Sequence, residues 1–168
     1  MTASTGIDPR GPRFSAGITA VLLLVVIGLH LGTVSGVGTA GPWPGRLYTP
    51  AFLLFVALAG LFAWGAFAGV ARHPWGAVYR ALVRPRLAPP AELEDPAPPT
   101  FAQGVGLAVT VVGLVLHVAG VPYGLVAAAS AAFVAAFLNS VFGYCLGCQL
   151  YVLFVRAGIL GRRGATAV

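Results

Sequence analysis

Cys145 and Cys148 are the residues of this chain whose types and spacing suggest chemistry. They are the only cysteines among 168 residues, and they lie three positions apart at the end of a long apolar run. On a helix this spacing places both sulfurs on one face. A helix beginning there favours the thiolate through its dipole and its N–H groups. The pattern indicates thiol–disulfide exchange or sulfur transfer, with Cys145 attacking and Cys148 resolving.

Two other interpretations of the cysteines stay open. In one, Cys145, Cys148 and His73 bind a metal ion, although tetrahedral zinc needs a fourth ligand that the sequence does not supply. A homodimer contributing four cysteines is another route to such a site. In the other, the cysteines only pack against a neighbouring helix, as free cysteines often do. The chain would then be a non-catalytic membrane scaffold or accessory subunit, so the sequence leaves open whether it is an enzyme.

His30 and His117 form a second candidate site, because each lies about 16 residues into an apolar segment, roughly 24 Å along a helix. Paired histidines on two helices can hold a haem or a metal ion, or contact a quinone, and ionisable groups inside a membrane are functional candidates. The alternative is a pair hydrogen-bonded to loop carbonyls. No other cofactor is evident. The histidines and the cysteines are expected at opposite membrane faces, so they cannot form one site.

Composition assigns the chain to the integral membrane proteins. Of its residues 58% are hydrophobic and only 8% are charged, whereas soluble domains carry about 25% charged residues. Mean hydropathy is +0.91. The formal charge of +6 does not indicate nucleic acid as a partner, because the arginines flank apolar segments. The predicted partner of most of the surface is the lipid bilayer.

The predicted architecture is an all-α membrane protein with four transmembrane helices and two short interfacial helices. About 20 apolar residues cross the bilayer, and the expected spans are about 14–34, 50–71 and 101–119, with a fourth from near Leu125. A GxxxG pattern from Gly65 to Gly69 suggests a helix contact. Asn139 and Gly143 mark a predicted break before a last helix over about 146–158. Residues 38–40 also resemble a signal-peptide cleavage site.

The other interfacial helix is expected to begin at Pro74 and to stop at Pro85, before a proline-rich linker. With four spans, this region and both termini share one membrane side. That side carries nine of the ten arginines, and only Arg46 lies on the other. The positive-inside rule therefore predicts a multi-pass membrane protein with both termini in the cytoplasm.

An internal duplication is predicted within a single membrane domain, residues 1–168. Asp8-Pro9 and Phe14 recur 87 residues later as Asp95-Pro96 and Phe101, and the same shift takes His30 onto His117. A shift of 72 residues takes His73 onto Cys145. The copies are about 8–86 and 95–160, joined by a linker over about 87–94. Each copy is a helical hairpin followed by an interfacial helix.

The chain resembles a bacterial, mainly actinobacterial, family of integral membrane proteins catalogued as domain-of-unknown-function family 4395. The matching features are Asp8-Pro9-Arg10, the linker from Arg84 to Phe101 and the segment 142–148, FGYCLGC. The resemblance implies a multi-pass membrane protein without an established activity. It also suggests, by association, a thioredoxin-like or sulfurtransferase protein as the cytoplasmic partner.

A weaker similarity is to the vitamin K epoxide reductase arrangement, a four-helix membrane bundle with a CxxC at a helix end. This chain lacks a second cysteine pair. Electrons would therefore have to come from a soluble thiol partner.

Overall fold

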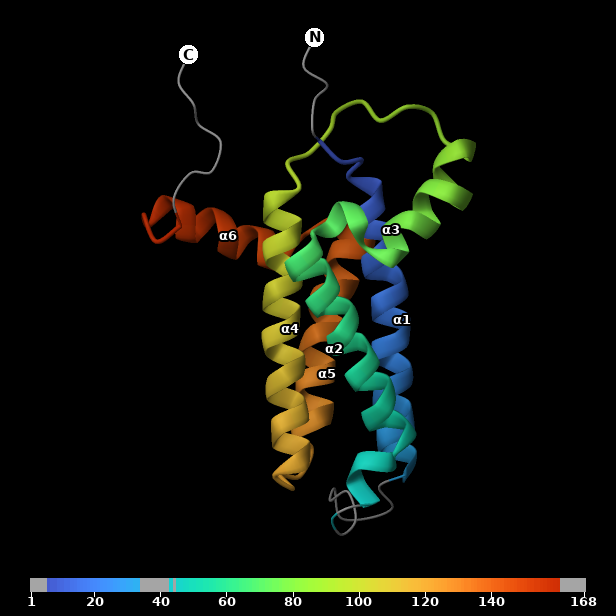
Figure 1. Ribbon diagram of the computed structural model, residues 1–168, viewed down its shortest axis with the longest axis vertical. Helices are drawn as coiled ribbons and strands as arrows, with labels where there is room; N and C mark the ends of the chain where they lie inside the picture. The colour runs from blue at the N-terminus through green and yellow to red at the C-terminus, as the bar shows by residue number, and fades with distance from the viewer. Residues whose placement is uncertain (1–5, 34–42, 44, 161–168) are drawn as a thin grey trace.

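The protein is a bundle of long apolar helices in a computed structural model that describes residues 6–33, 43 and 45–160 (Figure 1). Four segments are long and apolar enough to cross a membrane, which is consistent with a multi-pass membrane protein. They are α1 (Arg10–Thr33), α2 (Pro50–Ala68), α4 (Ala97–Val118), and α5 (Gly124–Phe137) continued by the π-helix η5 (Leu138–Phe142). The predicted all-α class is confirmed, and the described residues contain no strand beyond one isolated bridge.

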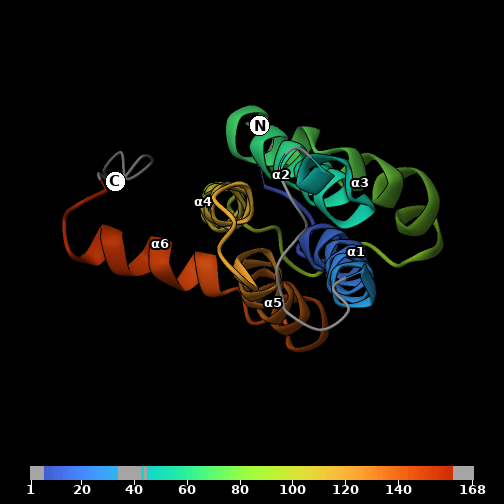
Figure 2. The same cartoon turned by 90° about the horizontal axis from the view of Figure 1, so that it is seen from below.

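The four spans pack as a ring in which α1 and α4 each contact both α2 and α5 (Figure 2). The centre is filled by large apolar side chains, among them Leu23, Phe55 and Leu125, all fully buried. Small residues let helices approach closely where lipid offers little hydrophobic driving force for association. A Cβ at Gly113 would lie 2.5 Å from the Cβ of Ala128, so this glycine sets the α4–α5 contact.

The observed ends of two spans differ from the predicted ones, at a glycine in one case and at prolines in the other. The third span begins at Ala97, four residues before the expected Phe101. Its first turn contains prolines, which are tolerated there because the N–H groups of a first turn have no partner within the helix. The second span ends at Ala68, since Gly69 adopts φ 84°. The GxxxG prediction is therefore wrong for Gly69, whereas a Cβ at Gly65 would lie 2.6 Å from Gln103 of α4.

Two short helical segments leave the bundle at the same end, as predicted. The first comprises the 3-10 turn η2 (Val70–Arg72), α3 (Pro74–Val78), the π-helix η3 (Tyr79–Val83) and the turn η4 (Arg84–Arg86). The second is α6 (Leu146–Arg156). Figure 2 shows that they project from opposite sides of the bundle. The predicted break at Gly143 is confirmed, because this residue ends η5 with φ 69°.

The described part of the loop between the first two spans contains the 3-10 turn η1 (Gly45–Tyr48). The remainder of that loop, including the cleavage-like residues 38–40 and the expected span end Val34, lies outside the described residues, as do Arg162 and Arg163.

At the opposite end of the bundle, the segment before α1 pairs with the linker before α4. Ile7 and Glu94 exchange two backbone hydrogen bonds of 2.9 Å each.

Candidate functional site

The CxxC lies where the fourth span turns into α6. Cys145 is the N-cap residue of α6, in extended conformation, and its Sγ accepts a hydrogen bond of 3.2 Å from the backbone N–H of Cys148. The two residues form a disulfide, with Cα atoms 5.2 Å apart. Both are half-buried. The pair thus lies outside the membrane-spanning segments, at the N-terminus of a helix, as the sequence predicted for a reactive thiol.

Two contacts fix the CxxC against the bundle. Gly147 lies directly on α4, where a Cβ would come within 2.5 Å of the Cβ of Ala102. On the other side, Arg13 of α1 donates a 3.4 Å hydrogen bond to the carbonyl of Val141, and its guanidinium lies 3.3 Å from where a Cβ of Gly143 would be. Only a glycine between the cysteines permits this approach of α6 to α4.

Arg13 is a basic residue that the structure places against the segment just before the CxxC, and sequence reasoning missed it. Arg156 lies at the far end of α6, about 16 Å along an 11-residue helix. Arg13 and Val141 are 128 residues apart, and no local pattern indicates such a contact.

His73 is buried, and both of its ring nitrogens have partners. Nδ1 accepts a 3.3 Å hydrogen bond from the N–H of Trp75 and so caps α3, and Nε2 lies 3.2 Å from the carbonyl oxygen of Leu61. A carbonyl only accepts, so Nε2 carries the proton and the ring is neutral. Burial lowers the pKa of His73, and the hydrogen bond to Leu61 opposes that shift.

The structure does not bring His73 together with the cysteines. Within the described residues, no group of three His, Cys, Asp or Glu side chains is placed to hold a metal ion. The α3 and α6 segments leave the bundle on opposite sides (Figure 2). The predicted metal site of His73, Cys145 and Cys148 therefore has no support among the described residues.

His30 and His117 do meet, at the end of the bundle away from the CxxC. Their rings are in edge-to-face contact with centroids 5.4 Å apart, and both residues are buried. Nε2 of His117 lies 3.2 Å from the carbonyl oxygen of Arg46, and Phe52 stacks on the same ring. The carbonyl contact is the one expected of structural histidines beside a loop. A cofactor role for the pair stays a prediction.

Asp8 accepts a hydrogen bond of 3.0 Å from the backbone N–H of Arg10 at the start of α1, and its carboxylate also joins distant segments. Its carboxylate accepts two hydrogen bonds of 3.0 Å from the Arg10 guanidinium and one of 2.9 Å from the hydroxyl of Tyr79. Arg10 also donates to the carbonyl of Ala88 in the linker. This network, here called the Asp8 hub, joins the start of α1 to η3 and to the linker.

Opposing effects set the protonation of the hub. Burial raises the pKa of Asp8, but hydrogen bonds from Arg10 and Tyr79 and the charge of Arg10 outweigh it and hold that pKa below the usual range. Burial and the contact with Asp8 raise the pKa of Tyr79. Asp8 is therefore ionised and Tyr79 is a neutral donor at physiological pH. Beside the hub lies a cavity of about 400 Å³.

Comparison with known proteins gives one match. A family model described as "Domain of unknown function (DUF4395)" covers residues 7–156. Neither the curated proteins nor the solved structures contain a match to the chain.

Proposed function

The chain belongs to the DUF4395 family, whose description assigns no activity, and we propose that it is a membrane-embedded thiol–disulfide exchange protein that works through Cys145 and Cys148. The observation that carries this proposal is the disulfide at the N-terminus of α6, half-buried and outside the spans. A purely packed cysteine pair needs no helix N-terminus, whereas a reactive one benefits from it.

Support for Cys145 as the attacking residue comes from its position as N-cap. In the reduced protein its sulfur keeps the place of a capping acceptor, where the N–H of Cys148 and the positive end of the α6 dipole stabilise a thiolate. Cys148 lies in the first turn and reaches the same sulfur. Arg13 adds positive charge on the side facing α1.

The proposed reaction transfers two electrons. The Cys145 thiolate attacks one sulfur of a partner disulfide, which forms a mixed disulfide and releases one partner thiolate. Cys148, once deprotonated, attacks Sγ of Cys145, which closes the intramolecular disulfide and releases the second partner thiolate. The CxxC is oxidised and the partner reduced, and the partner thiolates take up the protons. A dithiol protein running the same steps backwards restores the reduced form.

We place the reaction on the cytoplasmic side of a bacterial plasma membrane, with a thioredoxin-like or sulfurtransferase protein as the partner. The support is the arginine distribution, together with the common end of the bundle shared by the starts of α1, α4 and α6 (Figure 1). With a sulfurtransferase partner, the same Cys145 thiolate would attack the outer sulfur of the partner's persulfide, which breaks that S–S bond, leaves a persulfide on Cys145 and releases the partner's thiolate.

We also propose that the chain is duplicated, with His73 and Cys145 as equivalent helix caps. Several contacts support this. Asp8 and Asp95 each accept a hydrogen bond from the N–H two residues later, of 3.0 and 2.9 Å. The ring pairs Phe14–Tyr79 and Phe101–Tyr151 lie at 5.7 and 5.6 Å and are related by the predicted shifts.

Trapping tests the proposed reaction. With Cys148→Ser expressed in a bacterial membrane, Cys145 is expected to accumulate a mixed disulfide or persulfide that reductant removes. Cys145→Ser is the matched control and is expected to accumulate at least tenfold less. If neither thiol of the reduced wild-type protein reacts with a maleimide in native membranes, the proposal fails. A membrane scaffold in which the cysteines only pack then becomes the better account.

A further inference from the structure

The cavity beside the Asp8 hub has no role in the thiol reaction. It is lined by the segment before α1, by α1 itself, by η2 and α3, by η3 and η4, and by Leu93 of the linker and Gln103 of α4. Its volume of about 400 Å³ is in the range of small-molecule sites. The CxxC does not line it. A ligand here would therefore be separate from the partner of the cysteines.

Two arginines on one helical face line this cavity. Arg80 and Arg84 are four residues apart on η3 and at the start of η4, a spacing that puts both side chains on the same side. Arg80 donates one hydrogen bond of 2.9 Å to the carbonyl of Ala71. Among the described residues neither arginine has an ion-pair partner, and the Asp8–Arg10 pair is the single salt bridge found there.

The acid in the cavity wall does not cancel these charges. Asp8 is the one lining carboxylate, and its oxygens already hold Arg10 and Tyr79. Because Asp8 is neutralised by Arg10, Arg80 and Arg84 leave the lining with a net positive charge. That balance excludes a cation as the preferred ligand and favours an anion.

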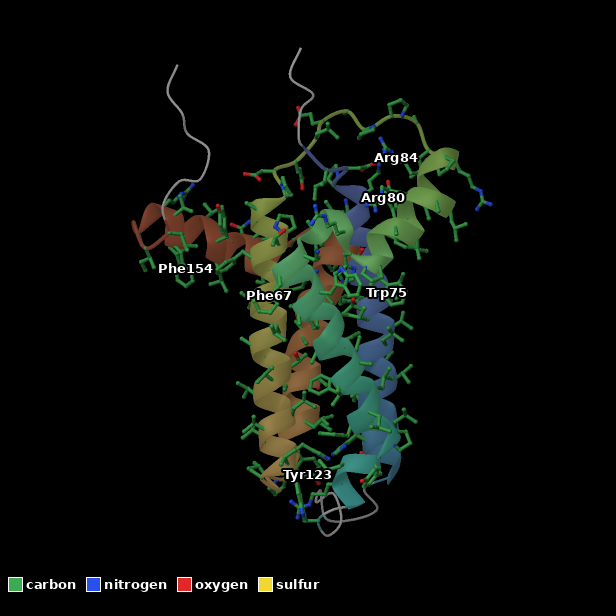
Figure 3. All side chains as sticks on the ribbon, viewed as in Figure 1. Phe67, Trp75, Arg80, Arg84, Tyr123 and Phe154 are labelled. Carbon is green, nitrogen blue, oxygen red and sulfur yellow. A yellow bond between two sulfur atoms is a disulfide. The ribbon has the colours of Figure 1, made fainter. Side chains whose placement is uncertain are left out.

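The rest of the wall suits the neighbourhood of a lipid headgroup. Ile7, Val70 and Leu93 provide apolar surface, and Gln103 lines the cavity from α4. Figure 3 shows Trp75 at about the level of Phe67 and Phe154, with Arg80 and Arg84 farther towards the end of the molecule. Aromatic residues are enriched at the membrane boundary, so we expect the arginines at the depth of lipid phosphate groups.

We propose that this cavity binds a phosphate group, with Arg84 and Arg80 as its cationic donors and Gln103 as a neutral donor from the inner wall. Guanidinium groups match phosphate oxygens in geometry and charge. The phosphate belongs either to an anionic phospholipid, whose glycerol and first methylenes would meet the apolar wall, or to a soluble phosphate ester.

Arg84→Gln is the sharpest test because Arg84 is exposed and its side chain makes no hydrogen bond or ion pair with another described residue. Arg156→Gln is the matched control, since it removes the same charge from the end of α6, away from the cavity. Binding of phosphatidylglycerol to the full chain in a neutral detergent is measured by native mass spectrometry, with diacylglycerol as the phosphate-free ligand.

The wild-type protein and Arg156→Gln are expected to bind one phosphatidylglycerol with affinities within twofold of each other. Arg84→Gln is expected to bind about tenfold more weakly, a difference of about 1.4 kcal/mol. Inorganic phosphate that displaces the lipid at millimolar concentration identifies a soluble phosphate ester as a sufficient ligand, whereas failure to displace it identifies the lipid. Equal weakening by both substitutions, or equal binding of diacylglycerol, overturns the proposal.

Discussion

The two corners at which a span turns into a short helix use the same cap position for different purposes. At the first corner His73 caps α3 through Nδ1, and its other nitrogen is tied to the carbonyl of Leu61. At the second corner Cys145 caps α6 through its sulfur, which also carries the disulfide to Cys148. Both ring nitrogens of His73 therefore have hydrogen-bond partners, whereas the sulfur of Cys145 carries a bond that can be reduced and formed again.

The corners also differ in the kind of contact that holds them. The α3 segment lies against α1, where the Asp8 hub joins it to the linker. The α6 helix is held at its start by Gly147 against Ala102 and along its length by ring contacts of Phe101, and it projects from the bundle (Figure 1). The first corner, tied to α1 and the linker by hydrogen bonds, suits a structural or binding role. A projecting one leaves room for a partner protein to reach the cysteines.

The largest effect on this comparison is expected from Gly147→Ala. A Cβ at this position would lie 2.5 Å and 2.6 Å from Cβ and Cα of Ala102, and the latter is backbone that cannot rotate away. We expect a loss of about 3 kcal/mol of unfolding free energy, measured by thermal unfolding in detergent, together with altered maleimide reactivity of the reduced cysteines.

Gly104→Ala, on the α4 helix that Gly147 contacts, is the control, because nothing lies within 4 Å of the place that its Cβ would take. It is expected to be neutral or to stabilise by up to about 1 kcal/mol. Equal behaviour of the two alanine variants would show that the approach of α6 to α4 does not hold the second corner.

A smaller loss of stability is expected from changing Asp8, which makes more hydrogen bonds at the first corner than its counterpart Asp95 makes at the second. Asp8→Asn removes the carboxylate that accepts hydrogen bonds from Arg10 and Tyr79. We expect a loss of about 2 kcal/mol of unfolding free energy. Asp95 is exposed and, in the described structure, accepts only the N–H of Ala97. Asparagine caps about as well as aspartate, so Asp95→Asn is expected to cost less than about 0.5 kcal/mol in the same unfolding measurement.

The smallest effect is a pH dependence of the first corner. Because the folded pKa of His73 lies below its unfolded value of about 6.5, the unfolded chain binds more protons as the pH falls below that value. The contribution of His73 is thus present above pH ~6.5 and is lost on acidification, by at most about 1.4 kcal/mol per pH unit. His73→Gln is expected to show a flatter stability profile between about pH 7 and 5. An unchanged slope would mean that other groups carry it.

Much of this architecture follows from local sequence. Apolar runs of span length predict four membrane-crossing helices, and Asn139 and Gly143 within the last run predict the break. The CxxC spacing predicts two sulfurs close together at a helix start. These predictions hold because each depends on residues within a few turns of one another. The exact ends of the spans follow less directly from the apolar runs, since prolines extend α4 by a turn.

The tertiary structure decided which distant residues meet. The sequence identified His30 and His117 as a pair, but their edge-to-face contact depends on how α1 and α4 pack. It did not indicate that Asp8 meets Tyr79, 71 residues away, or that Arg13 contacts the segment just before the CxxC. It also allowed His73 to join the cysteines, whereas α3 and α6 leave opposite sides of the bundle. Apolar helices offer many nearly equivalent faces, so composition and spacing determine that they span the membrane. Close packing of small and large side chains then selects one arrangement.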